Sequence, residues 1–313
     1  MQKLTEIKIF SGRSHPELVK EICRRLDIKL SPTKVQEYAN GCFEVILQDE
    51  MKDCKVFLLQ TSVPKTLHQD LWELFQMAGA AKENGASEVI VVMPYVSYAR
   101  SDKIYSQGMT VSAKILVKLL RASEIIGFIG VDFHSKAFEE FFPKRIRVYH
   151  ISALALLAEY LKTKRITNGI LLSGDEGYLE KTILLAKKLD LPVGLAKKKR
   201  IDDKTVIIEN IVGEVSEKDV IIFDDEISPA ATTLKTLAKE LEKRGAKSII
   251  SAVTHASFTQ ETIKNLQDIR ILREIIVTDT VPIPEEARKA LPLQVLSVAG
   301  LIAEKIKEIS EQL

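Results

Sequence analysis

Two adjacent carboxylates, Asp224 and Asp225, follow directly on an apolar run at residues 220–223. A short loop of small residues comes next, and leucines and alanines then recur at helical spacing from residue 233 onward. The acids are therefore predicted to stand where a buried strand gives way to a helix. In an open α/β sheet, ligands bind outside the carboxyl ends of the strands, and a helix N-terminus offers amides to a phosphate. The pair suits sugar hydroxyls or a metal ion, and the alternative is that it only caps the following helix.

A second polar stretch, residues 93–103, also follows an apolar run and mixes aromatic with charged side chains. Tyr95 and Tyr98 could stack on a base or wall it, whereas Arg100 and Asp102 supply a hydrogen-bond donor and an acceptor. The alternative is a surface turn held by the Arg-Asp pair.

Asp132, His134 and Asp175 stand directly after further buried-strand patterns. If the strand continues past Val131, alternation puts Asp132 and His134 on one side, where one orients the other or both approach a metal-bound phosphate. Asp175 lies in a loop of small residues and suits magnesium, which prefers a few carboxylates together with phosphate oxygens. The alternatives are a hydrogen-bonded core histidine and a carboxylate that caps the next helix.

Four consecutive cations at residues 197–200 predict a mobile, solvated loop over residues 195–205. Such a loop could fold over bound polyphosphate and neutralise the charge that develops during transfer, or it could be a plain solvated turn. The sequence contains neither a G-x-x-x-x-G-K-[ST] loop nor a G-x-G-x-x-G turn. Walker-type ATPases and standard dinucleotide folds therefore lack motif support.

The amino-acid composition limits the classes of partner and the cellular compartment that we expect for this protein. The 313 residues, 46% of them hydrophobic, suffice for two cores. With 45 Lys and Arg against 43 Asp and Glu, the net charge of +2 favours neither nucleic acid nor an acidic membrane as a partner. The N-terminus lacks the apolar core of a signal peptide, no apolar run is long enough to span a membrane, and three cysteines lack paired metal spacing. We therefore expect a cytoplasmic protein with reduced thiols and no zinc site.

The elements that must position these residues alternate between apolar, β-branched runs and helical patterns. Continuously apolar runs are typical of strands that are covered on both faces. The predicted fold class is therefore α/β, with mainly parallel sheets flanked by helices. The strand-like runs lie at residues 7–10, 55–60, 88–93, 125–132, 169–173, 219–223 and 247–253.

A sequence pattern that occurs twice in the chain indicates two duplicated domains. Residues 81–92 and 241–252 each contain a helix end, a Gly-Ala pair and a following strand. Gly85 and Gly245 are placed to stop their helices in a left-handed conformation. The two copies lie too far apart in the sequence for a solenoid repeat. We predict an N-terminal domain at residues 1–148, a C-terminal domain at residues 149–294, and a helix at residues 295–313 that packs on the first domain.

Taken in order, these stretches resemble the ribose-phosphate diphosphokinases, also called phosphoribosyl diphosphate (PRPP) synthetases, over essentially the whole chain. The order and spacing of the motifs carry the resemblance, since no single motif is decisive. It implies two phosphoribosyltransferase-like domains, in agreement with the duplication. The matching motifs are IKIFSGRSHPEL, PYVSYARSD, QGMTVSAK, VDFH, SGDEG, KKR, DDEIS, RGAKSI, TDT and LSVAGLIAEKI.

The resemblance implies a reaction that moves the β,γ-diphosphoryl group of MgATP to the anomeric hydroxyl of ribose 5-phosphate, giving PRPP and AMP. Such transfer depends mainly on positioning and charge neutralisation, so basic side chains and Mg²⁺ suffice without an obvious general base. The first domain would bind ATP and the second ribose 5-phosphate. The implied roles are ATP contact for Arg100 and Asp102, magnesium-nucleotide binding for His134 and Asp175, stabilisation of the diphosphoryl group for Lys198 and Arg200, and ribose 5-phosphate binding for Asp224, Asp225, Ser228, Ala231 and Thr232.

The sugar-phosphate loop departs from the family's usual motif. The family reads D-D-x-x-[DS]-T-G-G-T, whereas this chain reads DDEISPAATT. Pro229 has no amide hydrogen, and Ala230 and Ala231 replace glycines that allow the backbone to approach phosphate closely. Each lost charge-assisted donor is expected to weaken phosphate binding by about 1.5–3 kcal/mol.

The base-reading segment, which is F-S-D-G-E in the family and comes from a neighbouring subunit, reads YANGC here. Tyr38 keeps an aromatic ring, whereas Asn40 and Cys42 replace carboxylates, and a thiol is a poor acceptor. Ser101 replaces the family's usual glutamine, so a relaxed base pocket is predicted. Lys52 cannot copy the bidentate fork of the arginine found in many members, so regulation by ADP is not expected. The resemblance also implies a homo-oligomer of dimer units, with the hexamer as one arrangement.

Three functions follow from these observations. An active diphosphokinase is the leading hypothesis, because the proposed catalytic, magnesium-binding and sugar-binding side chains are retained. The alternative is a non-catalytic or regulatory paralogue that assembles with an active synthetase, which the altered loop and base segment favour. A phosphoribosyltransferase that consumes PRPP would share the acidic pair but would need neither VDFH nor the KKKR run.

Overall fold

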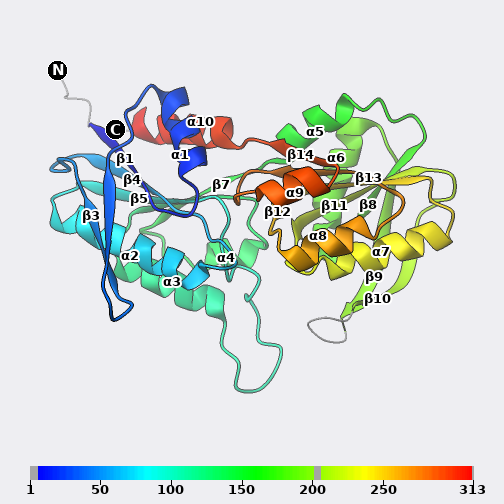
Figure 1. Cartoon of the computed structure of the whole chain (residues 1–313), viewed down its shortest axis with the longest axis horizontal. Helices are drawn as coiled ribbons and strands as arrows, with labels where there is room; N and C mark the ends of the chain where they lie inside the picture. The colour runs from blue at the N-terminus through cyan, green and yellow to red at the C-terminus, as the bar shows by residue number, and fades with distance from the viewer. Residues whose placement is uncertain (1–5, 201–205, 312–313) are drawn as a thin grey trace. The chain divides into compact units, whose positions relative to one another are not determined.

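The computed structural model describes residues 6–200 and 206–311, which form two compact units. The first unit extends to Ile151 and also includes residues 280–282 and the chain from Ser297 onward. The second unit comprises residues 152–279 and 283–296. The last helix therefore belongs to the same unit as the first strand, as the colours of Figure 1 show.

The first unit is built on a five-stranded parallel sheet. Helices α2 and α3 lie on one face of this sheet and helices α1 and α10 on the other (Figure 1). Continuous apolar runs suit such strands, because both faces are covered. The strands, in sheet order, are β1 (Ile7–Ser11), β4 (Lys55–Leu59), β5 (Glu88–Met93), β6 (Gly127–Val131) and β7 (Arg147–Ile151), and the helices are α1 (Pro16–Leu26), α2 (Leu67–Glu83), α3 (Ser112–Ala122), the short α4 (Lys136–Glu140) and α10 (Ala299–Glu311).

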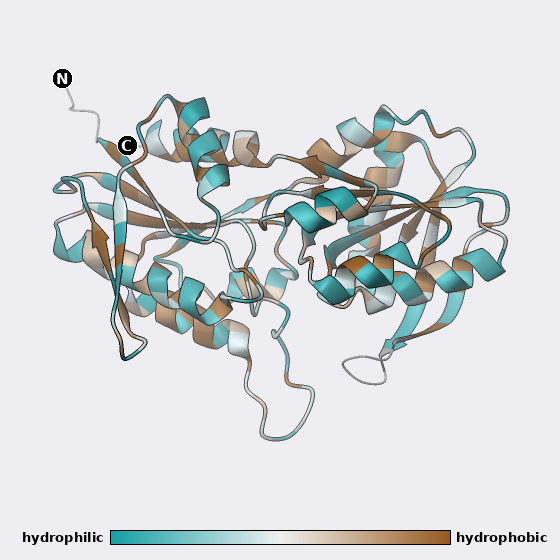
Figure 2. Ribbon diagram, viewed as in Figure 1, coloured by the Kyte–Doolittle hydropathy of each residue, from teal (hydrophilic) through white to brown (hydrophobic). Residues whose placement is uncertain are grey.

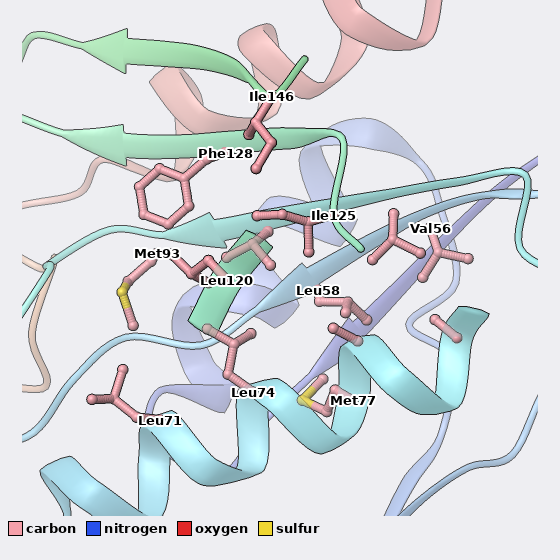
Figure 3. Packing of buried hydrophobic residues seen from close by; sticks show 14 of the residues in the cluster. Val56, Leu58, Leu71, Leu74, Met77, Met93, Leu120, Ile125, Phe128 and Ile146 are labelled. Carbon is pink, nitrogen blue, oxygen red and sulfur yellow. The ribbon is translucent and has the colours of Figure 1, made fainter. Parts of the chain in front are cut away.

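Apolar residues at helical spacing attach α2 to this sheet. Leu71, Leu74 and Met77 recur every third residue and are buried. In the same core lie Val56 and Leu58 of β4, as Figure 3 shows. The apolar face of the helix, which repeats every 3.6 residues, thus packs against the face of the strand, on which every second side chain lies. Together these two faces form one core.

A separate antiparallel hairpin extends from the first unit. It pairs β2 (Thr33–Glu37) with β3 (Phe43–Leu47). Gly41 has a φ of 86°, a left-handed value that favours glycine, and its amide donates to the carbonyl of Tyr38. The hairpin presents its turn, residues 38–42, as exposed chain.

The second unit contains a seven-stranded sheet in the order β10-β9-β8-β11-β12-β13-β14, parallel except for the β9–β10 pair. One buried cluster lies between this sheet and α5 and α6, and a second lies between it and α7, α8 and α9. Figure 2 shows apolar strands inside each unit and polar residues along the outer sides of the helices. The strands are β8 (Gly169–Ser173), β9 (Val193–Arg200), β10 (Val206–Val212), β11 (Asp219–Ile227), β12 (Ser248–Ala256), β13 (Leu272–Thr278) and β14 (Leu293–Leu296), and the helices are α5 (Leu154–Lys162), the 3₁₀ turn η1 (Glu176–Tyr178), α6 (Leu179–Leu189), α7 (Thr232–Lys243), α8 (Gln260–Gln267) and α9 (Glu285–Ala290).

The two glycine stops of the repeated sequence pattern are confirmed. Gly85 follows α2 with a φ of 84°, and Gly245 follows α7 with a φ of 77°. After each glycine, an alanine amide returns to a carbonyl of the last helical turn, Ala86 to Ala81 and Ala246 to Leu241. This left-handed ending turns the chain into a strand of the sheet in both units.

The α/β fold with parallel-dominated sheets is confirmed, but two local predictions are wrong. Residues 195–200, expected as the start of a mobile loop, form the end of β9, because their backbone pairs with β10; residues 201–205 lie outside the described chain. The strand expected at residues 219–223 continues to Ile227, so Asp224 and Asp225 lie within β11. In the described part of the chain, no helix is both long and apolar enough to cross a membrane.

Ser251 is an unsatisfied hydroxyl in the core of the second unit. It is 1% exposed on β12, between Ile222 of β11 and Ile275 of β13 in the sheet register. Among the described residues it carries one of two buried side-chain oxygens without a hydrogen-bond partner, the other being on Thr33. A buried hydroxyl without a partner costs stability.

Ser251→Ala is expected to raise the free energy of unfolding by about 1 kcal/mol, because it removes that unsatisfied group from an apolar site. Thermal unfolding followed by circular dichroism tests this. Ser248→Ala on the same strand is the control, since Ser248 Oγ donates to Asp219 Oδ1 at 2.7 Å and its loss should destabilise. A lower midpoint for Ser251→Ala than for the wild type would contradict the prediction.

Asp70 is a buried carboxyl in the first turn of α2. It is 3% exposed, and its Oδ2 accepts hydrogen bonds from the Val63 amide and the Thr66 hydroxyl. Burial outweighs these bonds and raises the pKa of Asp70 to about 6. The folded state therefore holds a proton between pH 4 and 6 that the unfolded chain releases, so stability falls as the pH rises through that window.

Asp70→Asn is expected to flatten this pH dependence, because Asn keeps an acceptor oxygen and carries no charge. Between pH 4 and 7, the free energy of unfolding of the variant should gain on that of the wild type by on the order of 2–3 kcal/mol. Denaturant unfolding at several pH values, followed by the fluorescence of Trp72, the only tryptophan of the chain, measures it. Parallel curves for the two proteins would show that burial does not shift this carboxyl.

Candidate active site

Parallel pairing brings the acids of the second unit to one edge of its sheet. Strands β8 and β11 pair so that Ser173 lies opposite Phe223, and the Gly174 amide donates to the Phe223 carbonyl at 3.2 Å. Asp175 follows Gly174, and Asp224 follows Phe223. The carboxyl ends of the two strands therefore place these acids beside each other, at the edge where open α/β sheets bind ligands.

Gly174 allows the acids to approach. A Cβ atom at this position would lie 2.3 Å from Asp224 Oδ2, so a larger residue would displace the carboxylate. The motif SGDEG contains this glycine, but sequence alone did not single it out, because the contact is with a strand distant in the chain. Asp175 also caps η1, since its Oδ1 accepts a hydrogen bond from the Tyr178 amide at 2.9 Å. Both roles considered for Asp175 are thus compatible.

Lys198 reaches the acids from the neighbouring strand. Strand β9 runs parallel to β8 up to Leu195 and then continues beyond the end of β8. Lys198 Nζ lies 3.1 Å from Asp175 Oδ2, and the two side chains are 23% and 35% exposed. The backbone of Arg200 ends β9 opposite Val206, while its side chain lies outside what the structure describes.

Three carboxyl groups, those of Asp175, Asp224 and Asp225, lie close enough in this cluster to repel one another when ionised. Burial first, then the negative charges of Asp225 and Asp175, raise the pKa of Asp224 to about 8 against the opposing effect of Lys198. Asp225 is 7% exposed, and its amide donates to Asp224 Oδ1 at 2.9 Å. The cluster therefore favours a ligand that brings positive charge or hydrogen-bond donors.

The loop from Ser228 to Ala231 is anchored by its carbonyls. The Pro229 carbonyl accepts from the hydroxyls of Thr259 and Thr262, and the Ala230 carbonyl accepts from Asn265 Nδ2 at 2.8 Å. These bonds hold the loop against the start of α8.

Ala231 keeps the left-handed conformation expected of a glycine. Its φ is 49°, and its amide donates to the Ser228 carbonyl. Thr232 is the first residue of α7, so the loop leads directly into a helix N-terminus. A loop of this shape at a helix N-terminus suits an anion, although Pro229 cannot contribute an amide.

In the first unit, the loop after β5 carries the second group of candidate residues. Arg100 is exposed, whereas Asp102 is only 8% exposed and its Oδ2 accepts a hydrogen bond from Ser135 Oγ at 2.7 Å. Tyr98 has a φ of 64°, and its hydroxyl lies 2.8 Å from His68 Nε2. Such a left-handed backbone is strained in a tyrosine, and strain of this kind is often found at functional sites.

The turn that carries His134 differs from the prediction. Strand β6 ends at Val131, and Asp132 then adopts a φ of 40°, so strand alternation does not apply. Asp132 is buried at 2% exposure, whereas His134 is exposed. The two side chains therefore do not share one side of a strand, and His134 alone is presented at the surface.

The turn of the hairpin holds the three residues of the altered base segment. The Tyr38 hydroxyl donates to Glu44 Oε2 at 2.7 Å, and Asn40 Oδ1 accepts from the Cys42 amide at 3.0 Å. Cys42 is exposed. The Asn40 side chain is thus partly used in forming the turn, while the ring of Tyr38 and the thiol of Cys42 are accessible.

Comparison with known proteins covers the whole chain. Residues 7–123 match a family model described as the N-terminal domain of ribose phosphate pyrophosphokinase, and residues 179–312 match the phosphoribosyl synthetase-associated domain. The ribose-phosphate pyrophosphokinase of Gloeobacter violaceus is 32% identical over 306 residues, which cover 97% of this chain and 90% of that protein. The chain belongs to the ribose-phosphate pyrophosphokinase family. The resemblance drawn from the motifs is therefore confirmed.

Further relatives agree with this placement. The ribose-phosphate pyrophosphokinase of Bacillus caldolyticus is 32% identical over 307 residues, covering 98% of this chain and 95% of that protein. The crystal structure of phosphoribosylpyrophosphate synthetase from Mycobacterium smegmatis matches 99% of this chain and 100% of that one, with a TM-score of 0.90 and 29% identity.

Asp224→Asn is expected to stabilise the protein by about 1–2 kcal/mol at neutral pH without divalent cations, because it removes one of the crowded carboxyls. The gain should grow as the pH rises from 4 toward 8, since the folded state retains a proton there that the unfolded chain releases. Thermal unfolding in the presence of a chelator measures it. Asp219→Asn at the other end of β11 is the matched control and should not stabilise, since Asp219 accepts from Ser248 and lies near Arg273. A variant less stable than the wild type would contradict the electrostatic account.

Proposed function

We propose that this protein transfers the β,γ-diphosphoryl group of ATP to the anomeric hydroxyl of ribose 5-phosphate, forming PRPP and AMP. The observation that carries the proposal is the cluster of Asp175, Lys198, Asp224 and Asp225 at one edge of a parallel sheet. It occurs in a chain that aligns over nearly its full length with proteins named ribose-phosphate pyrophosphokinase. The carboxylates can accept hydrogen bonds from the hydroxyls of a sugar, and the ammonium of Lys198 can neutralise the charge of a transferring diphosphoryl group.

The domains that we propose are residues 1–148, with the helix of residues 295–313 packed on them, and residues 149–294. The two domains would take different substrates. The first unit, with the loop of Arg100 and Asp102, would bind the nucleotide. The second unit would bind ribose 5-phosphate, with Asp224 and Asp225 accepting hydrogen bonds from the ribose hydroxyls. Ser228, Ala231 and Thr232, at the start of α7, would hold the sugar phosphate.

Lys198 would act on the reacting diphosphoryl group. Its ammonium already lies beside Asp175, from which it would turn toward an incoming anion. There it would neutralise the charge that develops as the bond to the α-phosphate breaks and the sugar hydroxyl bonds to the β-phosphorus. Arg200 would assist from the end of the same strand.

The residues present fit a magnesium ion held jointly with substrate. Among the described residues no three His, Cys, Asp or Glu side chains form a complete metal cage. Magnesium commonly keeps water and phosphate oxygens as ligands and takes only one or two carboxylates, so this sparse set is suitable. As the family resemblance implies, Asp175 and His134 would be the protein ligands of the magnesium-nucleotide, and the ion would supply charge neutralisation on the phosphates.

The hairpin would serve base recognition in an assembly. Tyr38 would stack on the base, and Asn40 and Cys42 would contact its edge with weaker acceptors than carboxylates, which would relax the preference for adenine. We propose that this hairpin serves the site of a neighbouring copy, as the family resemblance implies, so the protein would work as a homo-oligomer.

Lys198→Ala is expected to lower the rate of AMP formation from ATP and ribose 5-phosphate at least about 100-fold, because the neutralising cation is lost. The assay measures AMP and PRPP together, in Mg²⁺ and phosphate. Lys197→Ala is the matched control: the side chain is exposed on the same strand, and the rate should stay within about twofold.

Two results would count against the proposal in different ways. Turnover that survives Lys198→Ala would remove Lys198 from catalysis. A folded wild-type protein that forms no AMP with any nucleoside triphosphate would favour the non-catalytic paralogue, for which the proline in the sugar-phosphate loop would be the structural reason.

A further inference from the structure

His134 stands on a turn that is fixed on both sides while its own side chain is exposed. Asp132 and Phe133, which precede it, are 2% and 3% exposed. The ring of Phe133 packs among aromatic residues of the core, and Gly130 makes room for it, because a Cβ there would lie 2.1 Å from the ring. The turn thus projects one side chain from a rigid base.

The preceding side of the turn is held from strand β7. The Asp132 amide donates to the Ile151 carbonyl at 2.9 Å. His150 lies between two acids: its Nε2 is 3.8 Å from Asp132 Oδ1, and its Nδ1 is 2.8 Å from Glu139 Oε1 of α4. The His150 ring also packs against Phe133, with 4.8 Å between ring centroids.

The following side is held by an unusual use of a helix-capping serine. Ser135 occupies the N-cap position of α4, where a serine hydroxyl normally accepts a bond from the first turn. Here its side chain makes no capping bond; instead, Oγ donates to Asp102 Oδ2 at 2.7 Å. The carboxyl that receives this bond is itself 8% exposed.

We propose that Asp102 and Ser135 are positioning residues, which set the place of His134 relative to Arg100. The bond joins the loop of Arg100 to the turn of His134, two segments that adjacent strands β5 and β6 deliver to the same edge of the sheet. Because the Asp102 carboxyl is buried and its Oδ2 already accepts a hydrogen bond from Ser135, Asp102 acts on the nucleotide through Ser135. This inference rests on the proposed function, in which Arg100 and His134 both bind the magnesium-nucleotide.

The test compares Ser135→Ala with Ser135→Thr, which keeps the hydroxyl. Ser135→Ala should raise the KM for MgATP about tenfold, the usual order for losing an outer-sphere partner, while kcat and the KM for ribose 5-phosphate stay within about twofold. Ser135→Thr should restore the KM for MgATP to within about threefold of the wild type. Ser123→Ala is the matched control, since Ser123 Oγ donates only to the Leu119 carbonyl at the exposed end of α3.

A double variant tests the coupling. If Asp102 acts through Ser135, Asp102→Ala combined with Ser135→Ala should raise the KM for MgATP no further than Asp102→Ala alone. Multiplicative effects of the two changes would overturn the inference and assign Asp102 a direct contact with the nucleotide. A KM for MgATP in Ser135→Ala equal to that of the Ser123→Ala control would also overturn it.

Equilibrium binding separates this inference from the proposed function. Calorimetric titration of MgATP into the wild-type protein and into Ser135→Ala needs no turnover. Weakening by about tenfold in the variant supports the positioning role, even if the wild type forms no PRPP and the proposed function fails. Equal affinity for MgATP in the two proteins refutes the positioning role.

Discussion

The parallel pairing of β8 with β11 is the constraint on which the candidate active site depends. The register that sets Ser173 opposite Phe223 brings the chain after each strand to the same edge, so Asp175 and Asp224 become neighbours. Burial, followed by the neighbouring carboxylates, raises the pKa of Asp224, and Lys198 of β9 opposes this shift. The hydrogen bonds of the sheet and its apolar cores keep these carboxylates close together despite their mutual repulsion. The candidate site is therefore organised before any ligand binds.

The two units hold their candidate site residues by different means. In the second unit Asp224, Asp225 and Lys198 stand on strands, whose positions the ladders determine, and Asp175 follows two residues after the end of β8. In the first unit Arg100 and His134 lie on a loop and a turn, and buried neighbours replace the ladder as the anchor. Asp102 and Asp132 supply that anchoring, and the left-handed backbone at Tyr98 and Asp132 shows that the surrounding core tolerates local strain to maintain it.

The loop from Ser228 to Ala231 departs from the family's usual motif, and the structure shows what holds its backbone. Ala231 adopts the left-handed conformation that suits glycine, and the carbonyls of Pro229 and Ala230 are bound by side chains of α8. The geometry of the loop is thus maintained by its neighbours, while its capacity to donate amides is reduced. The loop therefore has the left-handed backbone that suits glycine at Ala231 but offers fewer amide donors to a ligand.

The α/β class, the glycine stops after α2 and α7, and the family were predictable from the sequence, because apolar periodicity, glycine positions and motif order can be read along the chain. The sequence also identified Asp175, Lys198 and the acidic pair as candidates. Which of these residues meet depends on how the strands pair. Pairing with β10 draws Lys198 into a strand, with its Nζ 3.1 Å from Asp175 Oδ2, and a Cβ atom at Gly174 would displace the Asp224 carboxylate. Asp132 turns inward while His134 turns out, and Ser135 gives up its helix cap for Asp102. These outcomes depend on partners far apart in the chain, and no local pattern carries that information.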